Sequence, residues 1–317
     1  MAKIAFIFPG QGAQYPGMGK DFYETSEAAR GVFARAAEVT GLDMERLVFT
    51  ENEDLDRTEY TQIAMITVEL AILKAVTEMG LKADVCAGLS LGEYAALAAS
   101  GVMEADDIFR IVRKRGIFMQ NAYPVGGAMS AVLGLDNEAV DAACQSASEK
   151  TGKVVTVANY NCPGQIVITG EAEAVAAAAE GCTTAGAKRV MPLNVSGPFH
   201  SALLSEASGK LAEELEKAEV HVPIIPYYSN VTAQAVTEAD GIRGLLADQI
   251  CSPVRWQQSV ERMIADGVDC FVEIGPGRTL AGFMKRINKE VRTCNIGTVE
   301  EMERAVELSE KREERNA

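Results

Sequence analysis

The sequence has few residues that bind metals. Its 317 residues include two histidines and seven cysteines, and no two cysteines form a CxxC pair. A structural zinc site usually takes four Cys or His ligands at close spacing, so we expect no metal site. The cysteines are odd in number and scattered, which also argues against a disulfide framework. We therefore expect reduced, mostly buried thiols and a cytoplasmic protein.

Long hydrophobic runs are also missing. The apolar run from Lys3 to Phe8 ends at Pro9-Gly10 and is too short for the core of a signal peptide. The most apolar helical stretch, Ile63 to Met79, still carries three charged residues, and nowhere do about 18 apolar residues follow one another. The sequence therefore predicts neither a secretory leader nor a membrane span.

Basic residues are outnumbered. There are 30 Lys and Arg against 45 Asp and Glu, which gives a formal net charge of −15. Proteins that bind nucleic acid need a basic surface, so we expect no nucleic-acid partner. The hydrophobic content of 48% and the charged content of 24% are ordinary for a folded protein. The length suits two domains, or one large domain with an insertion.

The first third of the chain alternates strands and helices. A buried strand is expected at 3–8, helices at 27–39 and 61–79, a second strand at 85–89, and a helix from residue 92. Strand-like runs return at 223–230 and 269–274. This alternation favours an α/β domain with a parallel-rich sheet.

Between these parts lies a segment of different character. Strands are expected at 129–135, 154–159, 165–169 and 188–194, with helices at 136–150 and 171–184. The resulting βαββαβ order is that of a ferredoxin-like α+β unit. Turns at Pro124-Val125-Gly126-Gly127 and Ser196-Gly197-Pro198 mark its ends. We therefore expect a discontinuous large α/β domain, residues 1–124 and 198–317, interrupted by a ferredoxin-like subdomain at 125–197, and a charge-rich tail from Glu300 that is a solvated helix or a frayed end.

One motif points to nucleophilic chemistry. Gly88-Leu89-Ser90-Leu91-Gly92 matches G-x-S-x-G, with a predicted strand before it and a helix after it. This is the context of a nucleophile elbow in an α/β-hydrolase-like domain, in which the serine occupies a strained turn at a helix amino terminus. A serine that only caps a helix would give the same short pattern.

A serine nucleophile needs a base, and the chain offers His200 and His221. His221 lies beside Pro223 and is expected at the surface. His200 lies where the chain leaves the inserted unit, so it would face the cleft between the two domains, a common place for ligand sites. No acidic residue stands out as a third member, and a backbone carbonyl could orient the imidazole instead.

Taken together, these residues resemble the malonyl-CoA:acyl carrier protein transacylase family. The motifs that carry the resemblance run in the family's order along most of the chain: Phe8-Pro9-Gly10-Gln11-Gly12, Thr61-Gln62, Gly88 to Glu93, Arg115, Gly197 to Ser201, Gln249 and Gly275-Pro276-Gly277. The inserted unit also falls where that family carries its ferredoxin-like subdomain.

The resemblance implies a ping-pong acyl transfer. Ser90 would attack the malonyl thioester while His200 takes its proton, and the malonyl-serine would pass its acyl group to the phosphopantetheine thiol of acyl carrier protein. The backbone N–H groups of Gln11 and Leu91 would bind the oxyanion. The backbone carbonyl of Gln249 would hold the His200 imidazole.

Arg115 can also be argued from its own neighbours. Residues 111, 112, 118 and 119, three and four positions away on the predicted helix, are all apolar, so Arg115 projects from the buried face. A buried guanidinium needs a partner, and a carboxylate fits best. The residues alone leave open whether that carboxylate belongs to the chain or to a ligand. The resemblance implies the free carboxylate of the malonyl group.

The resemblance places three further residues in the substrate site. They are Gln62, Phe199, which would leave little room for an α-methyl branch, and Asn161, which would contact the CoA or pantetheine arm. Read alone, Asn161 could equally be a turn residue. No cofactor is expected, because malonyl-CoA is a substrate, and the expected partners are malonyl-CoA and acyl carrier protein, with the chain acting as a monomer.

Two other functions use the same residues. A thioesterase or acylhydrolase would need the elbow but not Arg115, and a CoA-binding module would need neither Ser90 nor His200. Acyl carrier proteins are acidic, so an acidic enzyme needs a local basic patch to receive one. The candidates are Lys188-Arg189 and Lys285-Arg286-Lys289.

Overall fold

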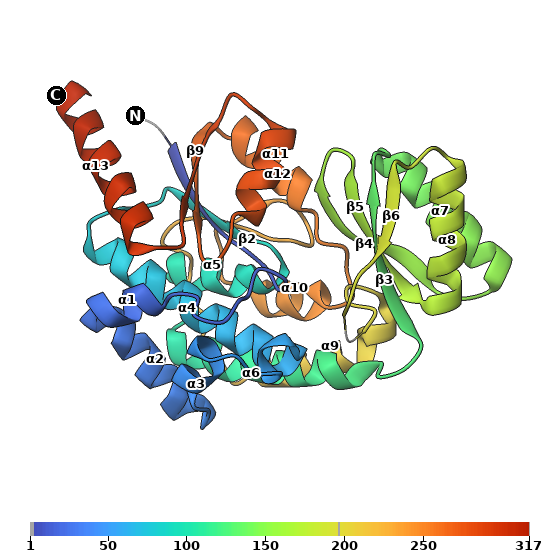
Figure 1. The fold of residues 1–317 in the computed structure, drawn as a ribbon, viewed down its shortest axis with the longest axis horizontal. Helices are drawn as coiled ribbons and strands as arrows, with labels where there is room; N and C mark the ends of the chain where they lie inside the picture. The colour runs from blue at the N-terminus through green and yellow to red at the C-terminus, as the bar shows by residue number, and fades with distance from the viewer. Residues whose placement is uncertain (1–2, 196, 317) are drawn as a thin grey trace.

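The computed structural model describes residues 3–195 and 197–316, with side chains described as far as residue 307. A six-stranded sheet forms the centre of the larger unit (Figure 1), in the order β10-β9-β1-β2-β7-β8. All its pairings are parallel except that of β7 with β8. The strands are β1 (Lys3–Phe8), β2 (Val85–Gly88), β7 (Tyr227–Tyr228), β8 (Ala235–Val236), β9 (Val268–Ile274) and β10 (Arg292–Ile296).

Both faces of this sheet are buried, which explains the continuous apolar run of β1. Phe6 and Phe8 belong to one core cluster, and Ala5 and Ile7 to another. The first cluster includes α4 (Thr58–Glu78), α5 (Glu93–Ala99) and α6 (Ala105–Ala122), and the second includes α11 (Trp256–Ala265) and α12 (Thr279–Ile287). A strand in a parallel sheet with helices on both faces has apolar residues at nearly every position. A strand with one solvated face would instead alternate apolar and polar residues.

The remaining helices of the larger unit are α1 (Lys20–Thr25), α2 (Glu27–Thr40), α3 (Met44–Phe49), α9 (Ser205–Leu215), α10 (Ile242–Gln249) and α13 (Val299–Asn316). By length and composition α4 could cross a membrane, but 78% of its apolar window is buried inside the protein. Its apolar residues therefore belong to the core.

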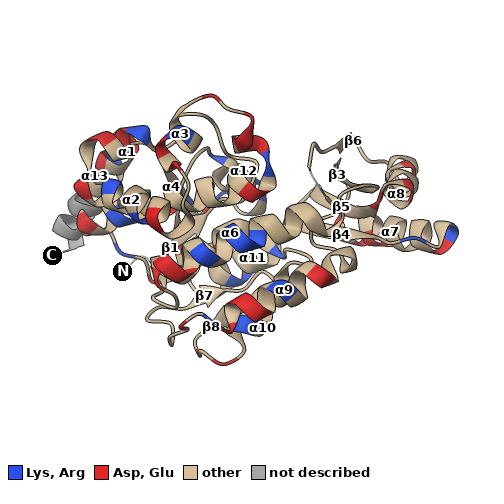
Figure 2. Cartoon of the chain, turned by 90° about the horizontal axis from the view of Figure 1, so that it is seen from below, with Lys and Arg blue, Asp and Glu red and all other residues tan. Residues whose placement is uncertain are grey.

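The smaller unit has its own antiparallel sheet, in the order β4-β5-β3-β6. Its elements are β3 (Gly127–Leu133), α7 (Asn137–Thr151), β4 (Val155–Cys162), β5 (Gln165–Glu171), α8 (Ala172–Thr184) and β6 (Arg189–Pro192). The two helices lie on the side of the sheet away from the larger unit (Figures 1 and 2). Asp136 caps α7 by accepting the N–H of Ala139.

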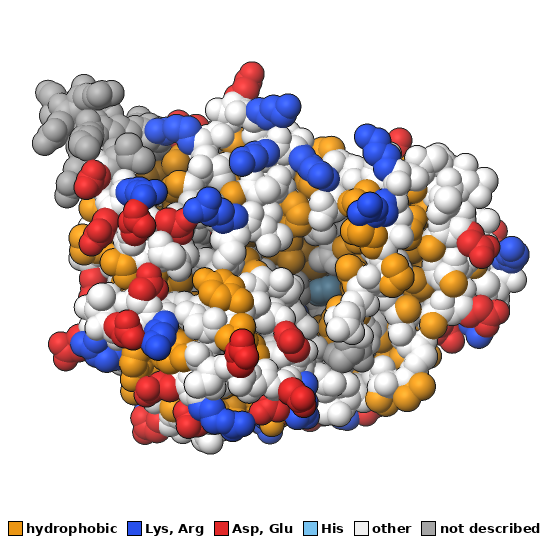
Figure 3. All heavy atoms as spheres, in the orientation of Figure 1, with side chains coloured by type: hydrophobic (Ala, Val, Ile, Leu, Met, Phe, Trp, Pro, Cys, Tyr) orange, Lys and Arg blue, Asp and Glu red, His pale blue; other side chains and the backbone are white. Residues whose placement is uncertain are grey.

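Hydrogen bonds join the smaller unit to the larger one along β4. The N–H of Tyr160 donates to the carbonyl of Val254 at 2.9 Å, and the N–H of Val254 donates to the carbonyl of Ala158 at 2.8 Å. Arg286 of α12 adds a bond from Nη1 to Gln165 Oε1 at 3.2 Å. In the orientation of Figure 1, the surface is hollowed between the two units, and a histidine side chain lies at the bottom of the hollow (Figure 3).

The structure confirms the mixed α/β class, the parallel-rich sheet and the separate α+β segment, and it corrects three details. The strand expected at 223–230 shortens to two residues, because only Tyr227 and Tyr228 of that segment are paired with β2 as strand residues. Asn161 lies within β4 and not in a turn. The tail is a helix whose Met302 and Val306 are buried against the core. Ser196 of the predicted boundary turn lies outside the described residues.

Candidate active site

Ser90 lies in a tight turn between β2 and α5. Its φ of 52° is in the left-handed region, which non-glycine residues rarely occupy. A Cβ on Gly88 would lie 1.9 Å from the carbonyl carbon of Gly92, and a Cβ on Gly92 would lie 2.3 Å from the carbonyl oxygen of Phe8. The two glycines of the motif are therefore required by backbone contact. This is the geometry of a nucleophile elbow.

The loop after β1 packs directly on this turn. The N–H of Leu89 donates to the carbonyl of Phe8 at 2.9 Å, and a Cβ on Gly10 would lie 2.7 Å from the carbonyl oxygen of Leu89. The loop thereby brings Gln11 alongside the turn that carries Ser90 and Leu91. Gln11 is tied down by a bond from Nε2 to Thr58 Oγ1 at 3.0 Å.

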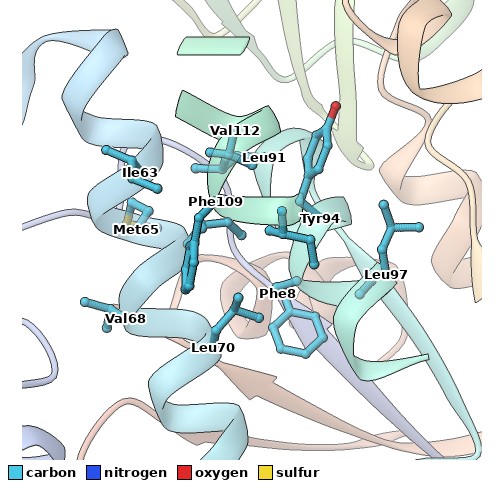
Figure 4. Packing of buried hydrophobic residues seen from close by; sticks show 14 of the residues in the cluster. Phe8, Ile63, Met65, Val68, Leu70, Leu91, Tyr94, Leu97, Phe109 and Val112 are labelled. Atoms are coloured by element: carbon cyan, nitrogen blue, oxygen red, sulfur yellow. The ribbon is translucent and has the colours of Figure 1, made fainter. Parts of the chain in front are cut away.

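Leu91 anchors the turn in the core. Its side chain is buried, and it lies with Tyr94 beside Phe109 and Val112 of α6 (Figure 4). Such packing fixes the backbone of the residue that follows Ser90, which is where an oxyanion would need a rigid N–H donor.

His200 lies within hydrogen-bond distance of Ser90. Its Nε2 is 2.8 Å from Ser90 Oγ, and its Nδ1 is 2.8 Å from the carbonyl oxygen of Gln249. Because a carbonyl only accepts, Nδ1 carries the proton and Nε2 is free to accept the proton of the serine hydroxyl. His200 also has a positive φ, of 61°, and its side chain is buried.

The surroundings keep His200 neutral. Burial, and after it the positive charge of Arg115, lower the pKa of its imidazole to about 4. Hydrogen bonds to the backbone of Gln249 and Ser252 act in the opposite direction. A neutral imidazole beside a serine hydroxyl, oriented from behind by a carbonyl, can act as a general base.

Arg115 of α6 is fully buried and reaches the same serine. Its Nη2 donates to Ser90 Oγ at 3.2 Å and to Gln249 Oε1 at 3.0 Å, and its Nη1 donates to Gln62 Oε1 at 2.7 Å. Among the described residues it forms no ion pair with a carboxylate, and its Nε has no hydrogen-bond partner. Burial lowers the pKa of the guanidinium, although Tyr94 and Glu93 partly oppose this.

Glu93 and Asn230 also belong to the site, although the sequence assigned neither of them a role. The side chain of Gln249 donates from Nε2 to the carbonyl of Ser90 at 2.9 Å and to Glu93 Oε2 at 2.5 Å. Asn230 accepts the N–H of Ser90 at 2.6 Å. Burial raises the pKa of Glu93 to about 7, against the effects of its hydrogen bonds and of Arg115. Only the G-x-S-x-G-E spacing hinted at Glu93, and nothing local pointed to Asn230.

Three other predicted site residues, Gln62, Phe199 and Asn161, differ in whether they contact the residues around Ser90 and His200. Gln62 is buried beside Arg115 and also approaches Met119, with Nε2 3.4 Å from its sulfur. Phe199 is buried next to His200. Asn161 is buried on β4, its Oδ1 lacks a partner in the described part of the chain, and no described contact joins it to Ser90 or His200. His221 is exposed, as predicted.

The rest of the described chain offers no competing centre of this kind. In residues 3–195 and 197–316 there is no group of three or more His, Cys, Asp or Glu side chains that could hold a metal ion. A groove of about 1280 Å³ lies on another part of the surface, lined by α2, α4 and α13, and none of the site residues faces it.

Comparisons with known proteins agree with this geometry. The acyl transferase domain family matches residues 5–315. A malonyl CoA-acyl carrier protein transacylase of Bacillus subtilis is 44% identical over 97% of both chains, and one of Escherichia coli K12 is 42% identical over 97% of this chain and 100% of its own.

Solved structures give the same result. A malonyl CoA-acyl carrier protein transacylase of Clostridium perfringens superposes with a TM-score of 0.93 at 44% identity, covering 99% of this chain and 98% of that one. A complex of a type II PKS acyl-carrier protein with its malonyl-transacylase has a TM-score of 0.93 at 40% identity, covering 96% and 99% of the two chains.

Proposed function

The chain belongs to the acyl transferase domain family, and on that basis we propose that it transfers the malonyl group of malonyl-CoA to the phosphopantetheine thiol of acyl carrier protein. One observation supports this above the others. A serine and a neutral histidine, 2.8 Å apart, share their site with a buried arginine that lacks a carboxylate partner among the described residues. The proposed setting is fatty-acid synthesis in the cytoplasm, with the chain acting as a monomer.

The first half-reaction acylates Ser90. His200 takes the hydroxyl proton as Oγ attacks the thioester carbon, and the oxyanion forms against the N–H groups of Gln11 and Leu91. Collapse of this intermediate breaks the carbon–sulfur bond, and His200 returns the proton to the leaving CoA thiolate. The products are malonyl-serine and CoA.

The second half-reaction reverses these roles. His200 takes the proton of the phosphopantetheine thiol, whose sulfur attacks the ester carbon of the malonyl-serine. The new intermediate collapses by breaking the bond to Oγ, and the proton passes from His200 to Ser90. Atoms and charges balance in both steps without a cofactor, and we propose that none takes part.

Arg115 would select the acyl group. The malonyl carboxylate can pair with the guanidinium, whose Nε offers a further donor. Gln62 and Gln249 accept hydrogen bonds from Nη1 and Nη2 and so orient the guanidinium. An acetyl group brings no carboxylate and would leave the arginine without an anionic partner. Phe199 would restrict space beside the α-carbon, and Asn161 would lie toward the CoA or pantetheine arm.

The test follows the acyl group by intact mass. Incubation with malonyl-CoA should add a malonyl adduct that is absent from Ser90→Ala and His200→Ala and that moves to acyl carrier protein when carrier is added. Release of free malonate without carrier would instead indicate a serine acylhydrolase or thioesterase. No adduct at all would indicate a CoA-binding module.

Two basic patches are proposed to receive the acidic carrier. Lys285 and Arg286 of α12 and Lys289 are exposed, and Arg286 bridges to the smaller unit, which carries exposed Lys188 and Arg189. Basic side chains gather above and beside the hollow (Figure 3). Charge reversal of either patch should raise the Michaelis constant for carrier, most strongly at low salt, whereas Lys210→Glu on α9 should not. Unchanged carrier kinetics in both patch variants would contradict this docking surface.

We also propose finer names for the two units. The strand order β4-β5-β3-β6 with helices between β3 and β4 and between β5 and β6 supports a ferredoxin-like subdomain at 125–197. The parallel strands and the elbow after β2 support an α/β-hydrolase-like domain at 1–124 and 198–317.

A further inference from the structure

The backbone at Ser90 is held in a conformation that it would not adopt alone. With a φ of 52°, the residue lies in the left-handed region, which is unfavourable for a residue with a Cβ. Such strain persists only where the surrounding structure over-determines it. The direction of Oγ depends on this backbone, so whatever holds the turn also aligns the hydroxyl with His200.

Asn230 brackets the turn on both sides. Its Oδ1 accepts the N–H of Ser90 at 2.6 Å, and its Nδ2 donates to the carbonyl of Gly88, also at 2.6 Å. The side chain is buried, with 1% of its surface exposed. One amide therefore satisfies a donor and an acceptor that lie on opposite sides of the strained residue.

Asn230 is itself held by the network that orients the histidine. Its own N–H lies 3.3 and 3.4 Å from the carboxylate oxygens of Glu93, and Glu93 accepts the side-chain amide of Gln249. The backbone carbonyl of Gln249 accepts the proton of His200 Nδ1. Ser90 and His200 are thus positioned from one buried cluster.

We propose that Asn230 is a positioning residue that sets the reactivity of Ser90 by clamping the turn through its side-chain amide. This proposal deepens the proposed function and rests on it only for the identity of the acyl group. The clamp requires one acceptor and one donor at the two ends of a short planar group. An ionised carboxylate of the same shape supplies two acceptors, so its second oxygen would face the carbonyl of Gly88.

The test is Asn230→Asp, measured as a function of pH. Two rates are followed by intact mass: single-turnover malonylation by malonyl-CoA and modification of Ser90 by a fluorophosphonate. At pH 8.5 both should fall about 100-fold, as for a misplacement of the reacting atom by about 1 Å, while the malonyl-CoA concentration for half-maximal rate changes little. Burial, the carboxylate of Glu93 and the carbonyl of Gly88 should raise the pKa of the introduced carboxyl above its ordinary value near 4. At pH 5.5 the deficit relative to the native chain should therefore shrink to less than about 10-fold, because the protonated carboxyl regains a donor for Gly88.

Asn52→Asp is the matched control. Asn52 also accepts a backbone N–H, from Leu55, and donates to a backbone carbonyl, that of Leu47, but it lies outside the site. Asn52→Asp makes the same amide-to-carboxyl change but does not touch the turn that carries Ser90. Both rates should therefore stay at native values at every pH. Thermal unfolding of the two variants measures the purely structural cost.

The outcomes separate the clamp from the proposed function. If the native chain takes no malonyl group but Asn230→Asp still slows the fluorophosphonate with recovery at low pH, the clamp holds and the proposed substrate is wrong. Native reactivity in Asn230→Asp, a deficit that does not change with pH, or the same deficit in Asn52→Asp would overturn the clamp. If Asn230→Asp does not fold, Asn230→Ser replaces it: a loss of at least about 10-fold in fluorophosphonate rate supports the clamp, and native reactivity overturns it.

Discussion

Arg115→Ala separates selection of the acyl group from the chemistry of acylation. The substitution removes a fully buried cation whose bonds reach Ser90, Gln62 and Gln249. In the proposed complex the guanidinium also pairs with the malonyl carboxylate, so malonyl-CoA loses an interaction that acetyl-CoA never had. The ratio of the two acylation rates therefore isolates the contribution of the ion pair.

The size of the effect follows from the burial of the pair. Removing one partner of a buried, hydrogen-bonded ion pair costs about 3–5 kcal/mol, because the other charge is left uncompensated. At about 1.4 kcal/mol for each factor of ten, malonyl acylation should fall roughly 100- to 4,000-fold in kcat/KM. Acetyl acylation should persist or rise, since the cost of an unpaired guanidinium disappears.

The assay is single-turnover acylation of Ser90 by malonyl-CoA and by acetyl-CoA, with the adduct measured by intact mass. Arg110→Ala is the control on the same helix, because Arg110 is partly exposed and pairs with Asp107 and Glu214. Its preference for malonyl over acetyl should not change. Malonyl acylation at the native rate in Arg115→Ala would refute the reasoning, and so would an equal loss for both substrates.

Three further predictions concern protonation and packing. Because burial and Arg115 lower the pKa of His200 to about 4, protonation of His200 should slow acylation only near pH 4; a loss centred near pH 6.5 that persists in Glu93→Gln, where the nearby carboxyl with a pKa of about 7 is removed, would contradict this. Burial and the nearby Glu273 raise the pKa of Glu69, whose carboxyl oxygens have no partner in the described chain. Since the pKa of Glu69 is higher in the folded than in the unfolded state, the free energy of unfolding falls as pH rises from the unfolded pKa to the folded one. Glu69→Gln should therefore stabilise the protein more at pH 8.5 than at pH 5.5, by up to about 1.4 kcal/mol per pH unit. An equal gain in stability at both pH values, measured by denaturant unfolding, would refute this prediction. Gly88→Ala should abolish the native fold or acylation because its Cβ would overlap the backbone of Gly92, whereas Gly181→Ala, with its nearest contact at 3.5 Å, should leave the melting temperature within a few degrees.

The elbow could be predicted because its signals are local. The strand before Ser90, the two glycines and the helix after it all lie between Val85 and Ala99, and the two glycines follow from backbone sterics. The burial of Arg115 was also predictable, since neighbours three and four positions away on one helix report which face it occupies. The spatial meeting of Arg115 with Ser90 was expected only through the family resemblance.

The network behind the serine was not predictable in this way. Asn230 reaches Gly88 and Glu93 across 142 and 137 residues, and no periodic pattern encodes contacts at such separations. Its own segment looked like a long strand, but only two residues pair with β2, and the rest of the segment is free to turn into the site. The sequence predicted a role for the backbone carbonyl of Gln249, which accepts from His200. The hydrogen bonds of its side chain, to Arg115, Ser90 and Glu93, depend on segments far apart in the sequence and were not predictable.

The order of strands in the larger sheet has a consequence for how the protein is made. β1 lies between β2 and β9, and its Lys3 pairs with Val268, far later in the sequence. Until β9 has been synthesised, β1 has an open edge, and unpaired edges favour association between chains. Contacts between residues so far apart in the sequence also slow folding, so the edge of β1 stays unpaired for longer. The Gln11 loop directly follows β1, so the final placement of Gln11 depends on a strand more than 250 residues later in the sequence.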